Sequence, residues 1–381
     1  MKGSFQIARF FGIPVEVHWT FGLIVLWILY VVYDKTGQFD PQMLFWQTLF
    51  VLSIFFCVML HEFGHALTAR KYGVKTLDII LSPIGGVARL DRMPEKPLQE
   101  FWVALAGPLV NVGIILLLSV YVLLQGDIKK SQFLDLLYLV VNPQSNTFAA
   151  GLSQFDYYVV GLIGLNAALA LFNLLPAFPL DGGRIFRALL SMRLNRLQAT
   201  RIAARTGQLL AIVLGLYGIA NGNIITAMIG VFVFSTAAGE YNYVKMEDAL
   251  SRTTVNDLVR TSYTLVPDSW HIPEMLQLIP HGLEKYFIVW DEYQGKPTGW
   301  VSDKMLFEAN KNASLNDLTE IADIQNTTLV EVQSSDSLHE AFNVMRTHQV
   351  PILLVKKEDE LIGVLDMGMV DQFIRMTRSL K

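Results

Sequence analysis

The stretch LFWQTLFVLSIFFCVMLHEFGHALTA, residues 44–69, decides how this chain folds. It is long and apolar enough to cross a bilayer as a helix, because a hydrocarbon core of about 30 Å takes roughly 20 apolar residues. Near its end it carries His61, Glu62 and His65, which are costly to place in lipid. The stretch therefore predicts both a membrane architecture and a functional site within it.

The composition supports a membrane protein with a soluble C-terminal part. Of the 381 residues, 52% are apolar and only 17% are charged, and the mean hydropathy is +0.39. The apolar excess ends at about residue 245. The net charge of -4 provides no basic field, which argues against nucleic acid as a partner. The single cysteine, Cys57, excludes an internal disulfide or a cysteine-based zinc site, and we interpret it as a packed helix residue.

Six apolar segments are candidates for transmembrane helices. The predicted fold class is a polytopic α-helical membrane protein with about six transmembrane helices, followed by a soluble α/β part. The first span could be mistaken for a signal peptide, but no small-residue cleavage site follows it, so we expect it to be retained. The fifth span is the shortest. The predicted spans are Trp19–Tyr33, Leu44–Ala69, Phe101–Leu124, Tyr157–Phe178, Gly207–Ile219 and Ile224–Gly239.

Basic residues indicate the orientation, because cytoplasmic loops carry the excess of Lys and Arg. These residues gather between spans two and three and between spans four and five. With six spans, both termini of this multi-pass cell-membrane protein are then expected in the cytoplasm. The two groups are Arg70, Lys71, Lys75, Arg89, Arg92 and Lys96, and then Arg184, Arg187, Arg193, Arg196, Arg201 and Arg205.

The first of these loops contains a further apolar run, Leu77 to Leu90, interrupted by Pro83, Gly85 and Gly86. Paired glycines permit a tight turn, so the run predicts a short hairpin or a re-entrant loop beside the membrane. A plain cytosolic loop is the alternative.

His61-Glu62-Phe63-Gly64-His65 is an HExxH motif. On a helix its two histidines lie about 40° apart around the axis, so both imidazoles can reach one metal ion. Neutral imidazole suits zinc, and the intervening Glu62 can take a proton from a water molecule whose pKa the zinc lowers to roughly 7. The motif predicts one catalytic zinc ion and hydrolysis of a carbonyl compound, with a peptide bond favoured. Core histidines satisfied by a buried Glu are the structural alternative.

Catalytic zinc usually takes three protein ligands. No other histidine is a good third ligand: His18 lies at the edge of the first span, and His271, His281, His339 and His348 lie in the soluble part. Asp181 is the strongest candidate, because Pro176 and Pro179 break the fourth helix just before it, near the cytoplasmic side. Its alternative role is the N-cap of a helix over Gly182–Leu190.

Three asparagines lie within the apolar spans, where polar groups are costly: Asn111, Asn166 and Asn173. We expect each to face the site or another of them, while helix packing is an equal alternative. Asn173 is the favoured site residue, because it belongs to the same motif as Asp181.

After about Glu247 the pattern changes to strand, helix, strand, turn, strand, helix, and this order occurs twice. It is an internal repeat of about 60 residues. The predicted domains are residues 1–246 for the transmembrane part, 249–310 for the first repeat and 315–376 for the second.

At these residues the chain resembles the site-2 protease family of intramembrane metalloproteases. The matching motifs are HEFGH, Ala106–Asn111 (AGPLVN) and Asn173–Arg184 (NLLPAFPLDGGR). The resemblance implies that His61, His65 and Asp181 bind zinc, that Glu62 is the general base, and that Asn173 holds the substrate or stabilises the oxyanion.

The resemblance also implies an intramembrane zinc endopeptidase, whose partners are the lipid bilayer and a membrane-protein substrate. Family members cleave transmembrane segments of membrane-bound transcription factors, anti-sigma factors or pro-sigma factors, a process called regulated intramembrane proteolysis.

The repeat is similar to a tandem pair of CBS domains, which places the chain near the branch that includes the stage IV sporulation protease. Such pairs often bind adenine nucleotides, using a Ser or Thr followed three residues later by Asp. Here Asp303 directly follows Ser302, without the expected spacing, and no Ser or Thr stands three residues before Asp366. Regulation by nucleotide is therefore no better supported than a structural role or homodimerisation through the CBS domains.

Two other classes of function compete with the protease. A CBS-regulated membrane transporter or channel would also contain polar residues within its spans, and an inactive scaffold could keep the fold. HExxH together with a distant Asp181 favours the protease, because a transporter has no need of a general base between two histidines.

Overall fold

The computed structural model separates into two units, Met1–Tyr241 and Asn242–Lys381. Each unit is described by itself, and the domain boundaries given above stay predictions. The described residues are 3–36, 40–83, 85–94, 96–125, 154–278, 284–311 and 319–379.

The first unit is built from long apolar helices, as expected of a chain whose backbone polar groups must all be paired within lipid. Five of the described helices are long and apolar enough to cross a membrane, and α1 (Gly22–Thr36) is apolar but shorter. The predicted polytopic helical fold is therefore confirmed. The five are α2 (Pro41–Lys71), α3 (Pro97–Gln125), α5 (Gln154–Asn173), α7 (Arg196–Ala220) and α8 (Ile224–Arg252).

Three helix boundaries differ most from the predicted spans. Helix α5 ends at Asn173, ahead of Pro176 rather than at Phe178. Helix α7 starts at Arg196, where the Asn195 side chain caps it, so the predicted short span is only its apolar half. Helix α8 continues well past the apolar run to Arg252. Apolar content marks the part of a helix that suits lipid, whereas caps and prolines mark where the helix ends.

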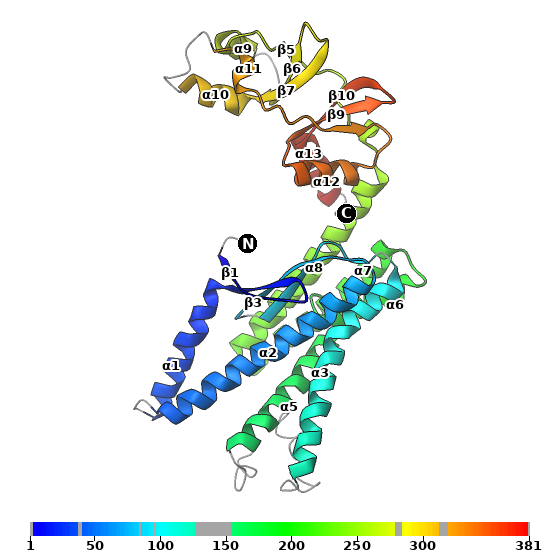
Figure 1. Ribbon diagram of the computed structural model, residues 1–381. Coiled ribbons are helices and arrows are strands. Elements are labelled where there is room, and N and C mark those ends of the chain that lie inside the picture. The colour runs from blue at the N-terminus through cyan, green and yellow to red at the C-terminus, as the bar shows by residue number, and fades with distance from the viewer. Residues whose placement is uncertain are drawn as a thin grey trace. The chain divides into compact units, whose positions relative to one another are not determined.

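A four-stranded sheet accompanies the helices, and its strands are in the order β1-β2-β3-β4. Figure 1 labels β1 and β3. Strands β3 and β4 pair antiparallel, which confirms the hairpin predicted in the second loop, and β2 pairs parallel to β3. Ile13, Val15 and Ile79 of the sheet form a buried cluster with Phe63 and Ala66 of α2. The sheet therefore covers one side of the helix that carries the HEFGH motif. The strands are β1 (Ser4–Phe10), β2 (Ile13–His18), β3 (Thr76–Ser82) and β4 (Gly85–Leu90).

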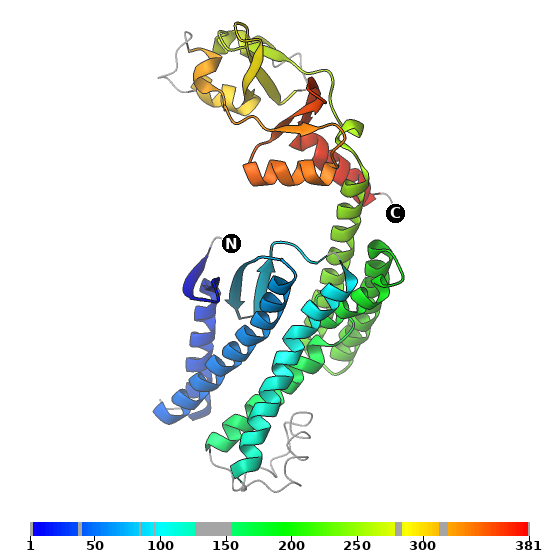
Figure 2. The same ribbon diagram turned by 45° about the vertical axis from the view of Figure 1, so that its right-hand side comes forward.

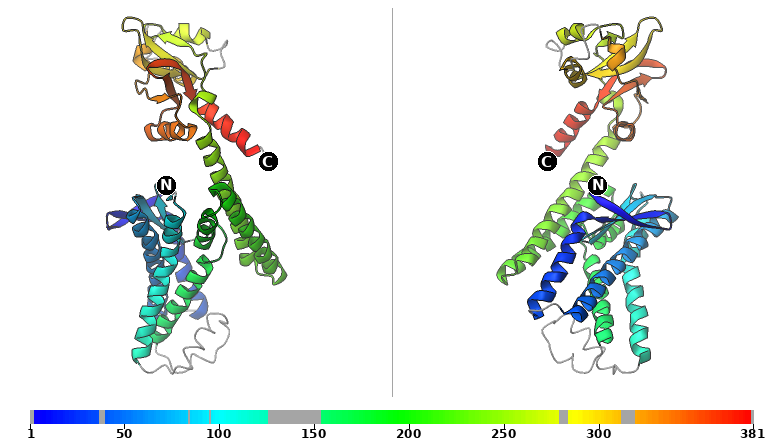
Figure 3. Two further views of the ribbon diagram at one scale, coloured as in Figure 1. Left: turned by 90° about the vertical axis from the view of Figure 1, so that its right-hand side faces the viewer. Right: turned by 60° about the vertical axis from the view of Figure 1, so that its left-hand side comes forward.

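Helix α3 is central to the first unit. It packs against α2, α5 and the short helix α6 (Asp181–Ser191), an arrangement visible in Figures 2 and 3. Because α2 carries the two histidines and α6 begins at Asp181, α3 contacts both helices that bring candidate ligands.

The second unit contains the predicted repeat. Each half has a three-stranded sheet in which the first strand pairs parallel to the second and the third pairs antiparallel to it. Each sheet lies over its own buried apolar cluster. The first half contains β5 (Leu265–Pro267), α9 (Ile272–Leu278), β6 (Tyr286–Asp291), β7 (Lys296–Ser302) and α10 (Asp303–Lys311); the second contains β8 (Glu331–Gln333), α12 (Leu338–His348), β9 (Ile352–Lys357), β10 (Glu360–Asp366) and α13 (Met367–Ser379).

Candidate metal centre

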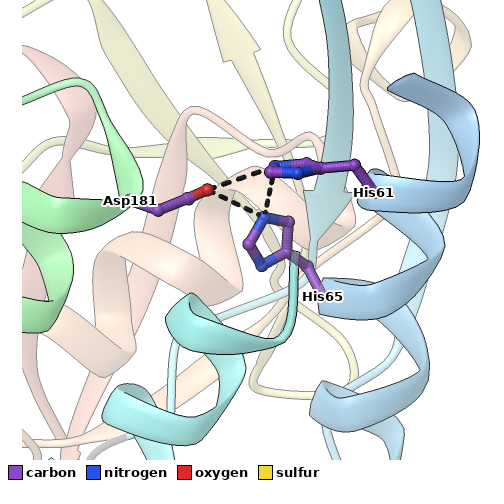
Figure 4. Close-up of side chains that lie close together, drawn as sticks. All are labelled: His61, His65 and Asp181. Atoms are coloured by element: carbon purple, nitrogen blue, oxygen red, sulfur yellow. Dashed lines mark hydrogen bonds and ion pairs between the residues drawn. The ribbon is translucent and has the colours of Figure 1, made fainter. Parts of the chain in front are cut away.

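His61, His65 and Asp181 meet at one buried point of the first unit (Figure 4). The two histidines lie one turn apart on the same face of α2, and their Nε2 atoms are 3.1 Å apart. Oδ2 of Asp181, at the start of α6, lies 3.2 Å from each of these nitrogens. Three ligand atoms from two distant segments therefore form a nearly equilateral triangle.

This triangle fits a zinc ion. Tetrahedral zinc with bonds of about 2.0–2.1 Å to nitrogen and oxygen has its ligand atoms about 3.3 Å apart, close to the 3.1 and 3.2 Å measured here. Two imidazoles and one carboxylate are also a typical donor set of catalytic zinc, which keeps a fourth position for water or substrate.

Each imidazole is oriented by a partner on α3. The Nδ1 atom of His65 donates to the carbonyl oxygen of Val103 at 2.7 Å, and Nδ1 of His61 lies 3.3 Å from Oδ1 of Asn111. A proton held on Nδ1 leaves the lone pair of Nε2 free for a metal. Asn111 is fully buried, so the expectation that it faces the site agrees with its contact to His61.

Gly107 of α3 leaves the space that the two imidazoles occupy. A Cβ atom built on Gly107 would lie 2.3 Å from Nε2 of His65 and 2.7 Å from Nε2 of His61. Any side chain at this position would displace both histidines. The AGPLVN motif therefore contributes Gly107 as space and Asn111 as an orienting contact.

Asp181 faces the histidines because of how α6 begins. Leu180 occupies the N-cap, Asp181 is the first helical residue, and its carboxylate contacts His61 and His65, so the alternative of Asp181 as the N-cap is wrong. Gly182 permits close packing here, since its Cβ would lie 2.3 Å from the carbonyl oxygen of Leu174.

Glu62 lies between α2 and the sheet. Its Oε2 atom accepts a hydrogen bond from the backbone N–H of Ala88 on β4, at 2.8 Å. A Cβ on Gly86 of the same strand would come within 2.8 Å of Cγ of Glu62. The strand thus holds a carboxylate directly beside His61 in the chain.

The other two asparagines are not part of the ligand cluster. Nδ2 of Asn166 donates to the carbonyl oxygen of Leu162 at 2.8 Å and lies 3.4 Å from Sγ of Cys57, so helix packing describes both residues. Asn173, the last residue of α5, is half-buried. Among the described residues its side chain forms no hydrogen bond with His61, His65 or Asp181.

The remaining described histidines lie outside this cluster. Nδ1 of His18 is 2.8 Å from Oγ1 of Thr20, at the start of a short 3-10 helix. His271, His339 and His348 belong to the second unit, and His281 lies outside the described residues. Among the described residues, the group that lies close enough to His61 and His65 to be the third ligand is therefore the carboxylate of Asp181.

Arg187 lies in a setting that differs from the predicted loop. It was counted with the loop cations that set the orientation, yet it is 1% exposed and pairs with Glu100 and Glu240. The signal that could have revealed this pairing is Glu100, a carboxylate at the edge of an apolar span, where an unpaired charge is costly.

Comparison with known proteins agrees with this geometry. The model of Peptidase family M50 matches residues 49–216, and that of the CBS domain matches residues 321–373. A zinc metalloprotease of Methanocaldococcus jannaschii is 36% identical over 290 residues, which cover 75% of this chain and 74% of that protein.

The chain is also similar to two further proteins. Stage IV sporulation protein FB of Bacillus subtilis is 26% identical over 191 residues, covering 50% of this chain and 54% of that one. The solved structure of the site-2 protease from Methanocaldococcus jannaschii matches 62% of this chain and 95% of its own, at 36% identity and a TM-score of 0.42. The chain therefore belongs to peptidase family M50, the site-2 proteases, and is a zinc metalloprotease of the membrane with a C-terminal CBS domain.

Proposed function

We propose that this zinc metalloprotease is an intramembrane endopeptidase that hydrolyses peptide bonds in or near transmembrane segments of membrane-bound partner proteins. The observation that carries the proposal is the triangle of His61, His65 and Asp181, two corners of which lie in a helix long and apolar enough to span a membrane. A site buried in such a helix suits substrates that are themselves in the membrane.

Each residue of the site has a proposed role. His61, His65 and Asp181 hold the zinc ion, which activates water and polarises the scissile carbonyl when bound. Glu62 takes the proton of the attacking water and passes it to the leaving amine. The hydrogen bond from Ala88 to Oε2 orients this carboxylate. Asn173 is proposed, from the family resemblance, to hold the substrate or stabilise the oxyanion.

The substrate is proposed to be extended where it is cut. Strand β4 is the edge of its sheet, so one side of its backbone is not paired with another strand of that sheet. Edge strands can add an extended peptide through main-chain hydrogen bonds. Because Glu62 contacts Ala88 of this strand, a peptide held beside β4 would lie close to the proposed base.

The CBS pair is proposed to regulate the protease or to dimerise it. Oγ of Ser302 accepts a hydrogen bond from the Met305 amide at 3.2 Å, and Oδ1 of Asp366 accepts one from the Met369 amide at 3.0 Å. Both side chains therefore cap the start of a helix. They do so at the positions where the pattern of Ser or Thr followed three residues later by Asp would bind a nucleotide. This favours a dimerising or structural module over a nucleotide switch.

The proposed substrates are membrane-bound transcription factors, anti-sigma factors or pro-sigma factors, and both termini of the protease are proposed to be cytoplasmic. The gathering of basic residues in two loops supports this orientation. Membership of a peptidase family argues against the transporter alternative.

The test compares membrane-protein fragments by proteomics in cells that express the wild type, Glu62→Gln or Glu308→Gln. Glu308 is an exposed residue of α10, and its variant is the matched control. Fragments cut within or beside transmembrane segments should be present with the wild type and the control and absent with Glu62→Gln. Equal fragments in all three cells would contradict the proposal and favour the inactive scaffold.

A further inference from the structure

Arg187 is a buried cation that the proposed chemistry does not use. A buried charge is stable only when it is paired and hydrogen-bonded. Nε of Arg187 donates to Oε1 of Glu100 at 2.7 Å, and Nη1 donates to Oε1 of Glu240 at 2.6 Å. The guanidinium also lies over the ring of Phe178, 5.1 Å from its centre.

The three charged residues come from three different helices. Arg187 is on α6, less than two turns after Asp181, and Glu240 is on α8. Glu100 is on α3, one turn before Val103, whose carbonyl oxygen accepts the hydrogen bond from His65. The pair of Arg187 and Glu100 therefore fastens the helix of the third ligand to the helix that orients the first two.

The position of Asp181 depends on this ion pair more than the positions of the two histidines do. Each histidine has its own orienting contact on α3. In contrast, the polar contacts of the Asp181 carboxylate in the described part of the chain are with the histidines themselves. Its distance from them is thus set by where α6 lies against α3.

We propose that Arg187 is the positioning residue of the metal centre: its ion pair with Glu100 sets the distance of Asp181 from His61 and His65. This inference rests on the proposed assignment of those three residues as the zinc ligands. Its pair with Glu240 makes the position of α6 depend also on α8, which continues to Arg252.

The two carboxylates should contribute unequally. The Glu100 side chain is 4% exposed, whereas that of Glu240 is 32% exposed, so water weakens the second pair. Loss of Glu100 is therefore expected to weaken zinc binding more than loss of Glu240.

The test measures zinc affinity, by competition with a chelator, in the purified full chain in detergent micelles. The absorption spectrum of the cobalt-substituted protein reports the geometry of the ligands in the same samples. We expect Arg187→Met to weaken zinc binding by about 10–100-fold, as is typical of residues that orient the ligands without binding the metal themselves. We also expect it to alter the cobalt spectrum. Arg187→Lys, which keeps the charge, should restore part of both. Asp248→Asn, which removes an exposed ion pair of α8, is the control and should change neither.

A double variant separates positioning from simple charge neutralisation. Glu100→Gln combined with Arg187→Met leaves no unpaired Glu100 charge, so the chain is expected to fold, yet it should still bind zinc weakly. Wild-type zinc affinity and cobalt spectrum in the folded double variant would overturn the inference. Asp181→Ala is measured beside it: if that variant also binds zinc as the wild type does, it is the ligand assignment that fails.

Discussion

The buried groups of the metal centre and the buried polar side chains of the second unit are bonded differently. In the first unit the buried charged groups in and beside the metal centre pair with side chains far away in the chain: His61 with Asp181, 120 residues on, and Arg187 with Glu100, 87 residues back. In the second unit, Asp291, Ser302 and Asp366 accept hydrogen bonds from backbone amides two or three residues further along, and Asp366 also pairs with the more exposed Arg260.

This difference separates chemistry from local structure. A bond to a nearby amide shapes a turn or begins a helix, and it forms whenever that turn forms. A buried pair across distant helices carries a desolvation cost, so we expect it where a function requires those groups. The contrast predicts that substitutions in the long-range pairs of the first unit change zinc binding and proteolysis, whereas substitutions at the local bonds of either unit change stability.

The largest effect is expected for Glu62→Gln. Loss of the general base should reduce proteolysis by about 10²–10⁴-fold, the usual contribution of such a group, while zinc stays bound. Cleavage of a tagged single-span membrane substrate, measured together with zinc content, checks this. Undiminished cleavage would remove Glu62 from the mechanism.

Asp181→Ala should weaken zinc binding by more than about 100-fold. This exceeds the 10–100-fold loss that is typical of residues that only orient the ligands. Zinc content after dialysis against a weak chelator measures the loss. Asp291→Asn in the second unit is the comparison and should retain its zinc, because Asp291 serves the local turn at Tyr293. Full zinc content in Asp181→Ala would exclude that residue from the ligand set.

Asn111→Ala and Asn166→Ala form a matched pair, since both asparagines are fully buried in membrane helices. Only Asn111 contacts His61. Its loss should weaken zinc binding by about 10–100-fold, whereas the loss of Asn166 should lower only thermal stability. Equal zinc affinity in the two variants would show that the Asn111 contact has no part in orienting the ligand.

The smallest effect is expected for Ser337→Ala in the second unit. Ser337 and Glu340 form a capping box at the start of α12. Losing it should destabilise this half of the repeat by about 1 kcal/mol. Faster hydrogen exchange of the α12 amides, with unchanged zinc content, is the expected result. A change in zinc content would break the separation between the two units.

Local patterns predicted much of this protein. HExxH could be placed on a helix, and Asp181 could be placed near it, because prolines end the fourth span just before that residue. The repeat was visible because its alternation of strands and helices recurs. These features depend on neighbouring residues, which a single sequence displays.

Long-range pairing was not visible. Strands β1 and β2 were not predicted from the sequence. Strand β2 is held in the sheet by parallel pairing with β3, which lies more than fifty residues away in the chain. Arg187 looked like a loop cation, because nothing near position 187 shows that Glu100 and Glu240 lie beside it. Such contacts follow from how helices pack, which residue type alone does not determine.

The most direct test of the metal centre is an anomalous difference map from crystals of the zinc-loaded protein, measured at the zinc absorption edge. The assignment predicts one strong peak within bonding distance of Nε2 of His61, Nε2 of His65 and the carboxylate of Asp181. A peak bound by other residues, or one that touches the histidines without Asp181, would contradict it.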